Sequence, residues 1–319
     1  VGASREVTAI LQLLRKVSDS PATILFMGET GTGKGLFARL VHDMSSRREA
    51  PFVQVNCAAL PEQLLESELF GHVQGSFTGA TRDKVGLFEE AAGGTLFLDE
   101  IEKIPEAMQA KLLHVLDRGE FRPVGATRTR RVEARVVCAT GGDLLDRIRA
   151  GRFLEDLYYR LNDITVRVPA LRERREDIPV LARHFLATYA RQLGKRIEGF
   201  SPEVIRLLHE WEWRGNVREL EKTVKRMVVL ADDGDVLAAT LLPAELRALA
   251  EGATAPAAAA RRGPARSLRM RVADLERGLI AESLERHRGN KSKVARELGL
   301  SYPTLLGRIK AYRLEACDS

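Results

Sequence analysis

The chain has 319 residues, a formal net charge of +6, and 45% hydrophobic and 29% charged residues. This balance is ordinary for two or three folded domains, and no apolar run reaches the roughly 20 residues of a membrane-spanning helix, so we expect no membrane partner. The three cysteines lie far apart without a C-x-x-C pair, which argues against a zinc site or a disulfide framework and predicts a cytoplasmic location, where thiols stay reduced. The first residue is Val1 rather than Met, so we expect a piece of a longer chain.

The first distinctive motif is a glycine-rich turn. Residues 4–18 have the spacing of an amphipathic helix, residues 22–27 form an apolar run typical of a buried strand, and residues 36–42 again have helical spacing. A G-x-x-x-x-G-K turn between a strand and a helix wraps backbone N–H groups around a polyphosphate, and Lys34 reaches the outer phosphates. The alternative is a tight turn that binds nothing. The predicted nucleotide-binding residues of this turn are Gly28, Glu29, Thr30, Gly31, Thr32, Gly33, Lys34 and Gly35.

Three later apolar runs predict parallel strands that end in polar residues. They cover residues 51–57 with Asn56, residues 95–100 with Asp99 and Glu100, and residues 135–140 with Thr140. The carboxyl ends of parallel strands face the ligand crevice, so the two acids indicate a Walker B pair. Asp99 would hold Mg²⁺, directly or through water, and Glu100 would orient and deprotonate the attacking water. Asn56 could equally be a plain turn former.

A loop with an aromatic tip lies between the second and third of these strands. Its sequence is Gly75-Ser76-Phe77-Thr78-Gly79-Ala80, and the glycines with small polar neighbours favour a mobile loop over a helix. An exposed Phe77 at such a tip would indicate a partner surface. The alternative is that Phe77 folds back into the core.

The α/β part ends with a helix that carries an arginine, and a helical segment follows it. Residues 153–161 predict a helix that carries Arg160, which could stabilise phosphoryl-transfer charge in a neighbouring subunit or simply form a surface salt bridge. Residues 178–193, 202–209 and 217–230 are helix-like, with almost no strand signal between them. Asn216 is predicted to be the N-cap of the last helix.

The C-terminal end is basic. Residues 261–319 contain 14 Lys or Arg residues against 7 Asp or Glu residues, and a basic terminal module on a neutral body indicates nucleic-acid binding. A first helix over Val272, Leu275, Leu279 and Leu284, a second over residues 291–298 and a third over residues 302–312 predict a helix-turn-helix. A three-helix interaction module is the alternative. The predicted DNA-contacting residues are Asn290, Lys291, Lys293, Ser301, Tyr302, Thr304, Arg308 and Lys310.

Residues 28–35, 75–80, 95–100 and 215–220 together resemble the sigma-54-dependent transcriptional activators, also called bacterial enhancer-binding proteins, and the chain from about Leu268 resembles their Fis-type DNA-binding domain. The resemblance implies an AAA+ ring ATPase, commonly a hexamer, that binds ATP and Mg²⁺ and hydrolyses ATP at subunit interfaces. It implies that the loop with Phe77 remodels the sigma-54 RNA polymerase holoenzyme while a dimeric helix-turn-helix holds enhancer-like DNA. By position, it implies the following roles: restraint of Glu100 for Asn56, sensor 1 for Thr140, sensor 2 for Arg218 and arginine finger for Arg160.

The predicted architecture is an α/β P-loop AAA+ core, with a parallel sheet flanked by helices, over residues 1–170. A small all-helical lid over residues 171–247, an Ala/Pro/Arg-rich linker over 248–267 and a three-helix domain over 268–319 complete it. Three residues depart from the family pattern near the phosphates, because Gly35 replaces Glu, Gly141 replaces Asn and Leu154 replaces a second arginine. We therefore expect slow hydrolysis. The alternative function is a DNA-binding regulator whose ring uses nucleotide mainly for assembly, with weak or no sigma-54 remodelling.

Overall fold

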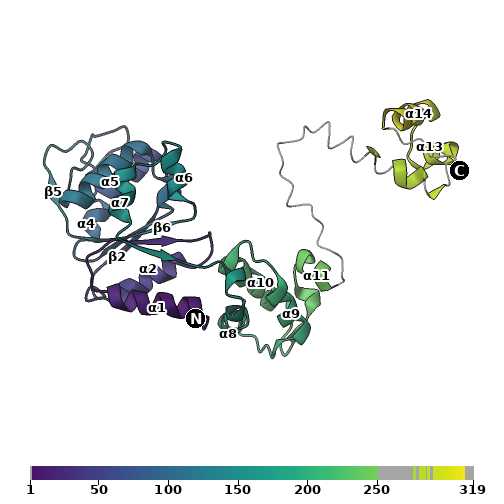
Figure 1. Ribbon diagram of the computed structural model, residues 1–319, viewed down its shortest axis with the longest axis horizontal. Coiled ribbons are helices and arrows are strands. Elements are labelled where there is room, and N and C mark those ends of the chain that lie inside the picture. Colours follow the sequence, from purple (N-terminus) through teal and green to yellow (C-terminus); the bar gives the residue numbers. More distant parts are fainter. Residues whose placement is uncertain (1, 251–275, 278–279, 285, 288–289, 313–319) are drawn as a thin grey trace. The chain divides into compact units, whose positions relative to one another are not determined.

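The computed structural model describes residues 2–250, 276–277, 280–284, 286–287 and 290–312 (Figure 1). The chain divides into two compact units, Val1–Ala253 and Thr254–Ser319. Within the described residues, no helix combines the length and the apolar character needed to cross a membrane.

The first unit is built on a parallel sheet with strand order β2-β3-β6-β1-β7. The register aligns the strand ends, because Asn56 pairs with Asp99 and Met27 pairs with Thr140. The polar residues predicted to end three strands therefore lie side by side at the carboxyl ends of the strands, beside the turn that follows β1. The strands are β1 (Ile24–Met27), β2 (Phe52–Asn56), β3 (Thr95–Asp99), β6 (Arg135–Thr140) and β7 (Ile164–Arg167).

Helices cover both faces of this sheet, which is why its central strands β1, β3 and β6 are apolar on both sides. Along β3, Leu96 and Leu98 pack in one hydrophobic cluster, and Phe97 between them packs in the other. Figure 1 shows α1 and α2 on one side and α4, α5, α6 and α7 on the other. Their bounds are α1 (Arg5–Val17), α2 (Lys34–Asp43), α3 (Glu62–Phe70), α4 (Leu87–Glu90), α5 (Glu106–Arg118), α6 (Leu144–Arg149) and α7 (Glu155–Leu161), with a 3₁₀ turn η1 (Ile101–Lys103) after β3 and a hairpin of β4 (Glu120–Phe121) and β5 (Arg130–Arg131).

The edge strand β7 was not among the strands predicted from the sequence. Its run Ile164-Thr165-Val166-Arg167 alternates apolar and polar residues, and only Val166 is fully buried. An edge strand has one paired side, so its sequence is less apolar than that of the central strands.

The lid that follows is helical, as predicted. Its core surrounds the fully buried Trp213, whose indole N–H donates to the carbonyl of Leu208 at 2.7 Å. A short parallel pair of two-residue strands was not anticipated, and α11 continues beyond the predicted end of the lid at residue 247. The elements are η2 (Leu171–Glu173), η3 (Arg175–Asp177), α8 (Ile178–Leu193), β8 (Gly199–Phe200), α9 (Pro202–Glu210), α10 (Asn216–Leu230), β9 (Val236–Leu237), η4 (Ala239–Leu241) and α11 (Ala244–Ala250).

The second unit contains the predicted helix-turn-helix, formed by α13 (Lys291–Glu297) and α14 (Tyr302–Ala311). Gly299 has a φ of +65° in the turn, a conformation that favours glycine. The small core comprises Ile280, Val294, Ala295, Leu305 and Ile309. Val272, Leu275 and Leu279 of the predicted first helix, and residues 251–267 of the predicted linker, lie outside the described residues.

Candidate functional site

The glycine-rich turn after β1 leads directly into α2, which begins at Lys34. Gly31 and Gly33 have φ values of +84° and +100°, so both adopt the left-handed conformation that only glycine takes at little cost. The Lys34 ammonium is buried and donates to the carbonyls of Gly28 at 2.7 Å and Glu29 at 3.0 Å. The turn is thus a closed loop around one cation at the N-terminus of a helix, an arrangement suited to anions.

Three carboxylates lie near this cation. Burial lowers the pKa of Lys34, and the charges of Asp99 and Glu102 oppose that shift. Burial likewise raises the pKa of Asp99, although its Oδ1 accepts a hydrogen bond from the Glu100 backbone N–H at 2.9 Å. Glu100 has a φ of +54°, which is unusual for a residue with a side chain and is often found at functional sites.

The side chains of the other two strand-end residues, Asn56 and Thr140, form hydrogen bonds with backbone groups two residues further along the chain. Asn56 Oδ1 accepts from the Ala58 N–H at 2.8 Å, which agrees with the turn-former interpretation. The buried Thr140 hydroxyl donates to the Gly142 carbonyl at 2.9 Å. Their predicted roles toward Glu100 and the nucleotide remain predictions.

The carboxylate of Glu29, predicted to bind nucleotide, points toward the lid. It accepts hydrogen bonds from Arg172 at both oxygens, at 2.8 Å and 2.5 Å, and one from Asn216 at 3.1 Å. The Arg172 guanidinium is the main cause of a fall in the pKa of Glu29 to about 2. Arg174 is buried next to this contact and donates to the Thr32 carbonyl at 2.8 Å. The sequence did not reveal that residues 172 and 174 fasten the glycine-rich turn to the lid.

The prediction that Asn216 is an N-cap is wrong. Gly215 is the N-cap of α10, and Asn216 is its first residue, fully buried and with a φ of +54°. Its Oδ1 accepts from the Leu171 N–H at 2.8 Å, and its Nδ2 donates to the Thr30 carbonyl at 3.1 Å. The side chain is therefore engaged in long-range contacts to the glycine-rich turn and to the start of the lid.

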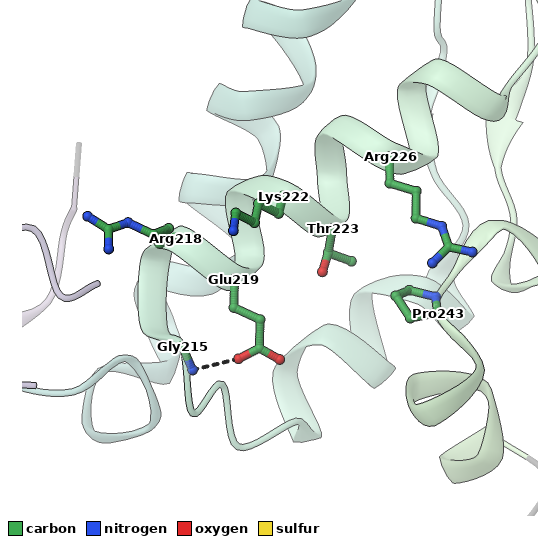
Figure 2. A pocket seen from close by; sticks show the side chains of 7 residues that line it. All are labelled: Gly215, Arg218, Glu219, Lys222, Thr223, Arg226 and Pro243. Atoms are coloured by element: carbon green, nitrogen blue, oxygen red, sulfur yellow. Dashed lines mark hydrogen bonds between the residues drawn. The ribbon is translucent and has the colours of Figure 1, made fainter. Parts of the chain in front are cut away.

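Arg218 lies two residues further along, at the same end of α10. Its backbone N–H donates to the Gly31 carbonyl at 3.3 Å, and a Cβ added at Gly31 would meet the Gly215 carbonyl oxygen at 2.4 Å. Figure 2 shows the Arg218 side chain extending away from the other labelled residues. Arg218 also lines a hollow of about 350 Å³. The hollow is lined by Gly215, Arg218, Glu219, Lys222, Thr223, Arg226 and Pro243.

Arg160 is held on the surface of its own subunit. Its Nη2 donates to the Leu116 carbonyl at 2.6 Å, and its Nε lies 3.0 Å from Asp117 Oδ1. This geometry agrees with the surface salt bridge that the sequence left as an alternative, and an arginine-finger role remains a prediction. Leu154, where the resemblance to the family implied a second arginine, is 41% exposed.

The loop at residues 75–80 projects its aromatic residue. Phe77 is 39% exposed, and its ring lies edge-on to that of His72, at 5.0 Å between ring centroids. The alternative that Phe77 folds into the core is therefore wrong. Gly75 and Gly79 have positive φ values with open space around them, and the Gly75 N–H donates to the Ala80 carbonyl at 2.9 Å. The tip is thus a tight turn that presents an apolar side chain.

The residues predicted to contact DNA divide into two groups. Lys291, Lys293, Tyr302, Thr304 and Lys310 are exposed on α13 and α14, and of these Thr304 shares a hydrogen bond between its hydroxyl and that of Ser301. Three others have partners within the unit. Asn290 and Ser301 cap the two helices by accepting from the N–H groups of Lys293 and Thr304, and Arg308 donates to the Tyr312 hydroxyl and pairs with Glu276.

The chain matches three family descriptions in succession. Residues 1–167 match the sigma-54 interaction domain, residues 172–259 match the AAA+ ATPase lid domain, and residues 271–312 match the bacterial regulatory proteins of the Fis family. The chain belongs to the sigma-54-dependent transcriptional regulators. The first match covers more than half of the chain, and the predicted combination of a P-loop AAA+ core, a helical lid and a helix-turn-helix is confirmed.

Relatives and solved structures agree with membership of this family. The transcriptional regulatory protein ZraR of Salmonella typhimurium is 44% identical over 309 residues, which are 97% of this chain and 68% of ZraR. The regulatory protein AtoC of Escherichia coli is 42% identical over 307 residues, 95% of this chain and 65% of AtoC. The crystal structure of NtrX from Brucella abortus in complex with ATP is 34% identical, with a TM-score of 0.75 over 98% of this chain and 68% of NtrX.

Proposed function

We propose that the chain is an ATP-driven transcriptional activator that assembles into a ring, commonly a hexamer, and hydrolyses ATP at its subunit interfaces. The observation that carries the proposal is the common position of Lys34, Asp99 and Glu100 at one edge of the sheet, with the lid bonded to the same glycine-rich turn. Lys34 would leave the carbonyls of Gly28 and Glu29 to bind the outer phosphates of ATP. Its desolvated charge would then interact strongly with them.

The acidic residues fit an Mg²⁺ ion delivered with the nucleotide. Mg²⁺ is usually bound through one or two carboxylates plus phosphates and keeps several of its waters. Asp99 supplies one such carboxylate, and a buried oxygen of Glu102 has no hydrogen-bond partner. When bound, Mg²⁺ would neutralise charge on the phosphates. Glu100 would orient the attacking water and accept its proton, and Arg160 of a neighbouring subunit would stabilise the transferring phosphoryl group.

The loop at residues 75–80 would then transmit the nucleotide state to sigma-54 RNA polymerase. The exposed ring of Phe77 supports this proposal, since a large apolar side chain at a glycine-flanked tip gains little from water and would gain from burial in a partner. The second unit would hold enhancer-like DNA as a dimer through the exposed cations of α13 and α14. Such a function belongs in the cytoplasm, where the DNA and the polymerase are found.

The second candidate is a DNA-binding regulator whose ring uses nucleotide mainly for assembly. Two observations favour it, because Arg160 is bonded within its own subunit and Leu154 supplies no second arginine. The replacements at Gly35, Gly141 and Leu154 lower the expected rate of hydrolysis. A ring that only assembles, however, would not need the exposed Phe77 at the tip of its loop.

The test is phosphate release by the purified full chain at increasing protein concentration. We expect a steep dependence on concentration if catalysis needs a neighbour, and the Glu100→Gln variant should lose on the order of 10²-fold or more in turnover while it still binds ATP. Phosphate release by Glu100→Gln at the wild-type rate would contradict the assignment of Glu100.

A second experiment separates the two candidate functions. The chain is trapped with a phosphoryl-transfer transition-state analogue, and capture of sigma-54 is measured for the wild type, for Thr78→Ala and for a matched control, Thr81→Ala, just outside the tip. We expect Thr78→Ala alone to lose capture while it keeps its phosphate release. Absence of capture by the wild type, together with normal phosphate release, would favour the assembly-only regulator.

A further inference from the structure

Of the three acidic residues whose charges act on Lys34 in the described part of the chain, Glu102 was not predicted from the sequence. It lies in the 3₁₀ turn η1 after β3 and is only 6% exposed. Its Oε1 accepts a hydrogen bond from the Gly141 N–H at 3.2 Å. Among the described residues, its buried Oε2 has no hydrogen-bond partner. Burial of a carboxylate oxygen without a hydrogen-bond partner costs free energy, so this oxygen points to a partner that is not part of the chain.

Gly141 makes room for this carboxylate. A Cβ at Gly141 would lie 3.3 Å from Glu102 Oε1 and 3.4 Å from Thr30 Oγ1. A larger side chain at this position would press on both atoms. The absence of a side chain at Gly141, first noted as a departure from the family pattern, therefore places the charge of Glu102 beside the glycine-rich turn.

The chemistry of the oxygen limits what its partner can be. A carboxylate oxygen only accepts hydrogen bonds, and so do phosphate oxygens, so a bare polyphosphate would be repelled by Glu102. Lys34 is a donor, but it is already bonded to Gly28 and Glu29 and is needed for the phosphates. A water of hydrated Mg²⁺ is a donor that enters with the nucleotide. Gly35 also lacks the hydroxyl that usually holds this ion in P-loop enzymes.

We propose that Glu102 couples nucleotide binding to the metal ion. Its charge disfavours ATP without a divalent cation, and its free oxygen accepts a hydrogen bond from a metal-bound water when Mg²⁺-ATP binds. Both effects act in the same direction, so they raise the ratio between the Kd measured without metal and the Kd measured with Mg²⁺. Glu102 is a positioning residue for the metal, and this inference rests on the proposed binding of ATP.

The test measures binding of a slowly hydrolysed ATP analogue to the full chain by titration calorimetry, once in excess Mg²⁺ and once in EDTA. Glu102→Gln keeps an oxygen for the Gly141 N–H but removes the charge. We expect its ratio of Kd without metal to Kd with metal to fall about tenfold, which corresponds to the loss of one charge-assisted hydrogen bond. The matched control is Glu106→Gln, which removes an exposed charge four residues further along and should leave the ratio unchanged.

An unchanged ratio in Glu102→Gln would overturn the proposal. If phosphate release fell at the same time, Glu102 would instead act on the reacting water, and if nothing changed it would only anchor Gly141. Should Glu102→Gln fail to fold, Glu102→Asp retracts the charge by one methylene and should also lower the ratio. Failure of the wild-type chain to bind the analogue in either condition would refute the proposed ATP binding itself, which separates the two failures.

Discussion

Replacement of Asn216 by alanine tests how strongly the lid is fastened to the glycine-rich turn. The change leaves the buried Leu171 N–H without its 2.8 Å acceptor, which costs about 1–3 kcal/mol. It also removes the donor to the Thr30 carbonyl and leaves alanine at a φ of +54°, where a residue without a polar side chain is strained by about 1 kcal/mol. We therefore expect a loss of about 3 kcal/mol in the free energy of unfolding of the lid.

The two tryptophans of the chain provide a selective assay. Trp211 and Trp213 both lie in the lid, so tryptophan fluorescence during urea unfolding of the full chain reports on this subdomain. With the slope of about 1–3 kcal/mol per M of urea that is usual for small domains, the midpoint of Asn216→Ala should fall by about 1–3 M. Asn216→Gly is the matched variant, because it loses the same hydrogen bonds but tolerates the positive φ, and should be about 1 kcal/mol more stable than Asn216→Ala. A wild-type midpoint for Asn216→Ala, or a lower midpoint for Asn216→Gly, would refute the reasoning.

Three further predictions concern other contacts. Because Arg172 lowers the pKa of Glu29 to about 2, this pair stabilises the fold above the usual glutamate pKa of 4.5, and the stabilisation is lost as pH falls toward 2. Arg172→Ala should lower the free energy of unfolding by about 1 kcal/mol at neutral pH, since solvent screens the half-exposed pair. It should also make the urea midpoint depend less on pH between about 2 and 4.5. A variant midpoint with the same pH dependence as the wild type would argue against this. Gly31→Ala should abolish ATP binding in calorimetry, because its Cβ would lie 2.4 Å from the Gly215 carbonyl oxygen at a φ of +84°; wild-type affinity would contradict this. Ser301→Ala should destabilise the second unit by about 1 kcal/mol through loss of its helix cap, measured as lower helicity by circular dichroism on heating, and an unchanged transition would count against the cap.

The parts of the fold that sequence reasoning found are those set by local signals. The glycine-rich turn, the strand that ends in Asp99 and the turn at Gly299 each depend on residues within a few positions of one another. The spacing of the apolar residues and the positions of the glycines indicate these elements. The central strands and the lid helices α8, α9 and α10 could therefore be predicted to within a few residues. The edge strand β7, whose short run alternates apolar and polar residues, and the helix α11 were not predicted.

The parts that sequence reasoning missed depend on contacts between distant residues. Asn216 has the amino-acid type of an N-cap, but its partner Glu29 is 187 positions away, and no local pattern reveals such a contact. Glu102 is one of many acids in the sequence, and only the fold brings it to Gly141. Side chains with polar atoms at the start of a helix or after a strand can serve local or long-range partners, and sequence alone favours the local choice.

The start of α1 is tied to the lid rather than to the sheet. The carboxylate of Asp177 accepts from the Ala3 N–H at 2.6 Å and from the Ser4 N–H at 2.8 Å, and its other oxygen accepts from the Ser4 hydroxyl at 2.7 Å. Asp177 is fully buried at the junction where α8 begins. Ser4 therefore serves two junctions at once, since its hydroxyl also caps α1 by accepting from the Val7 N–H, and loss of this one side chain would weaken both the start of α1 and the start of the lid.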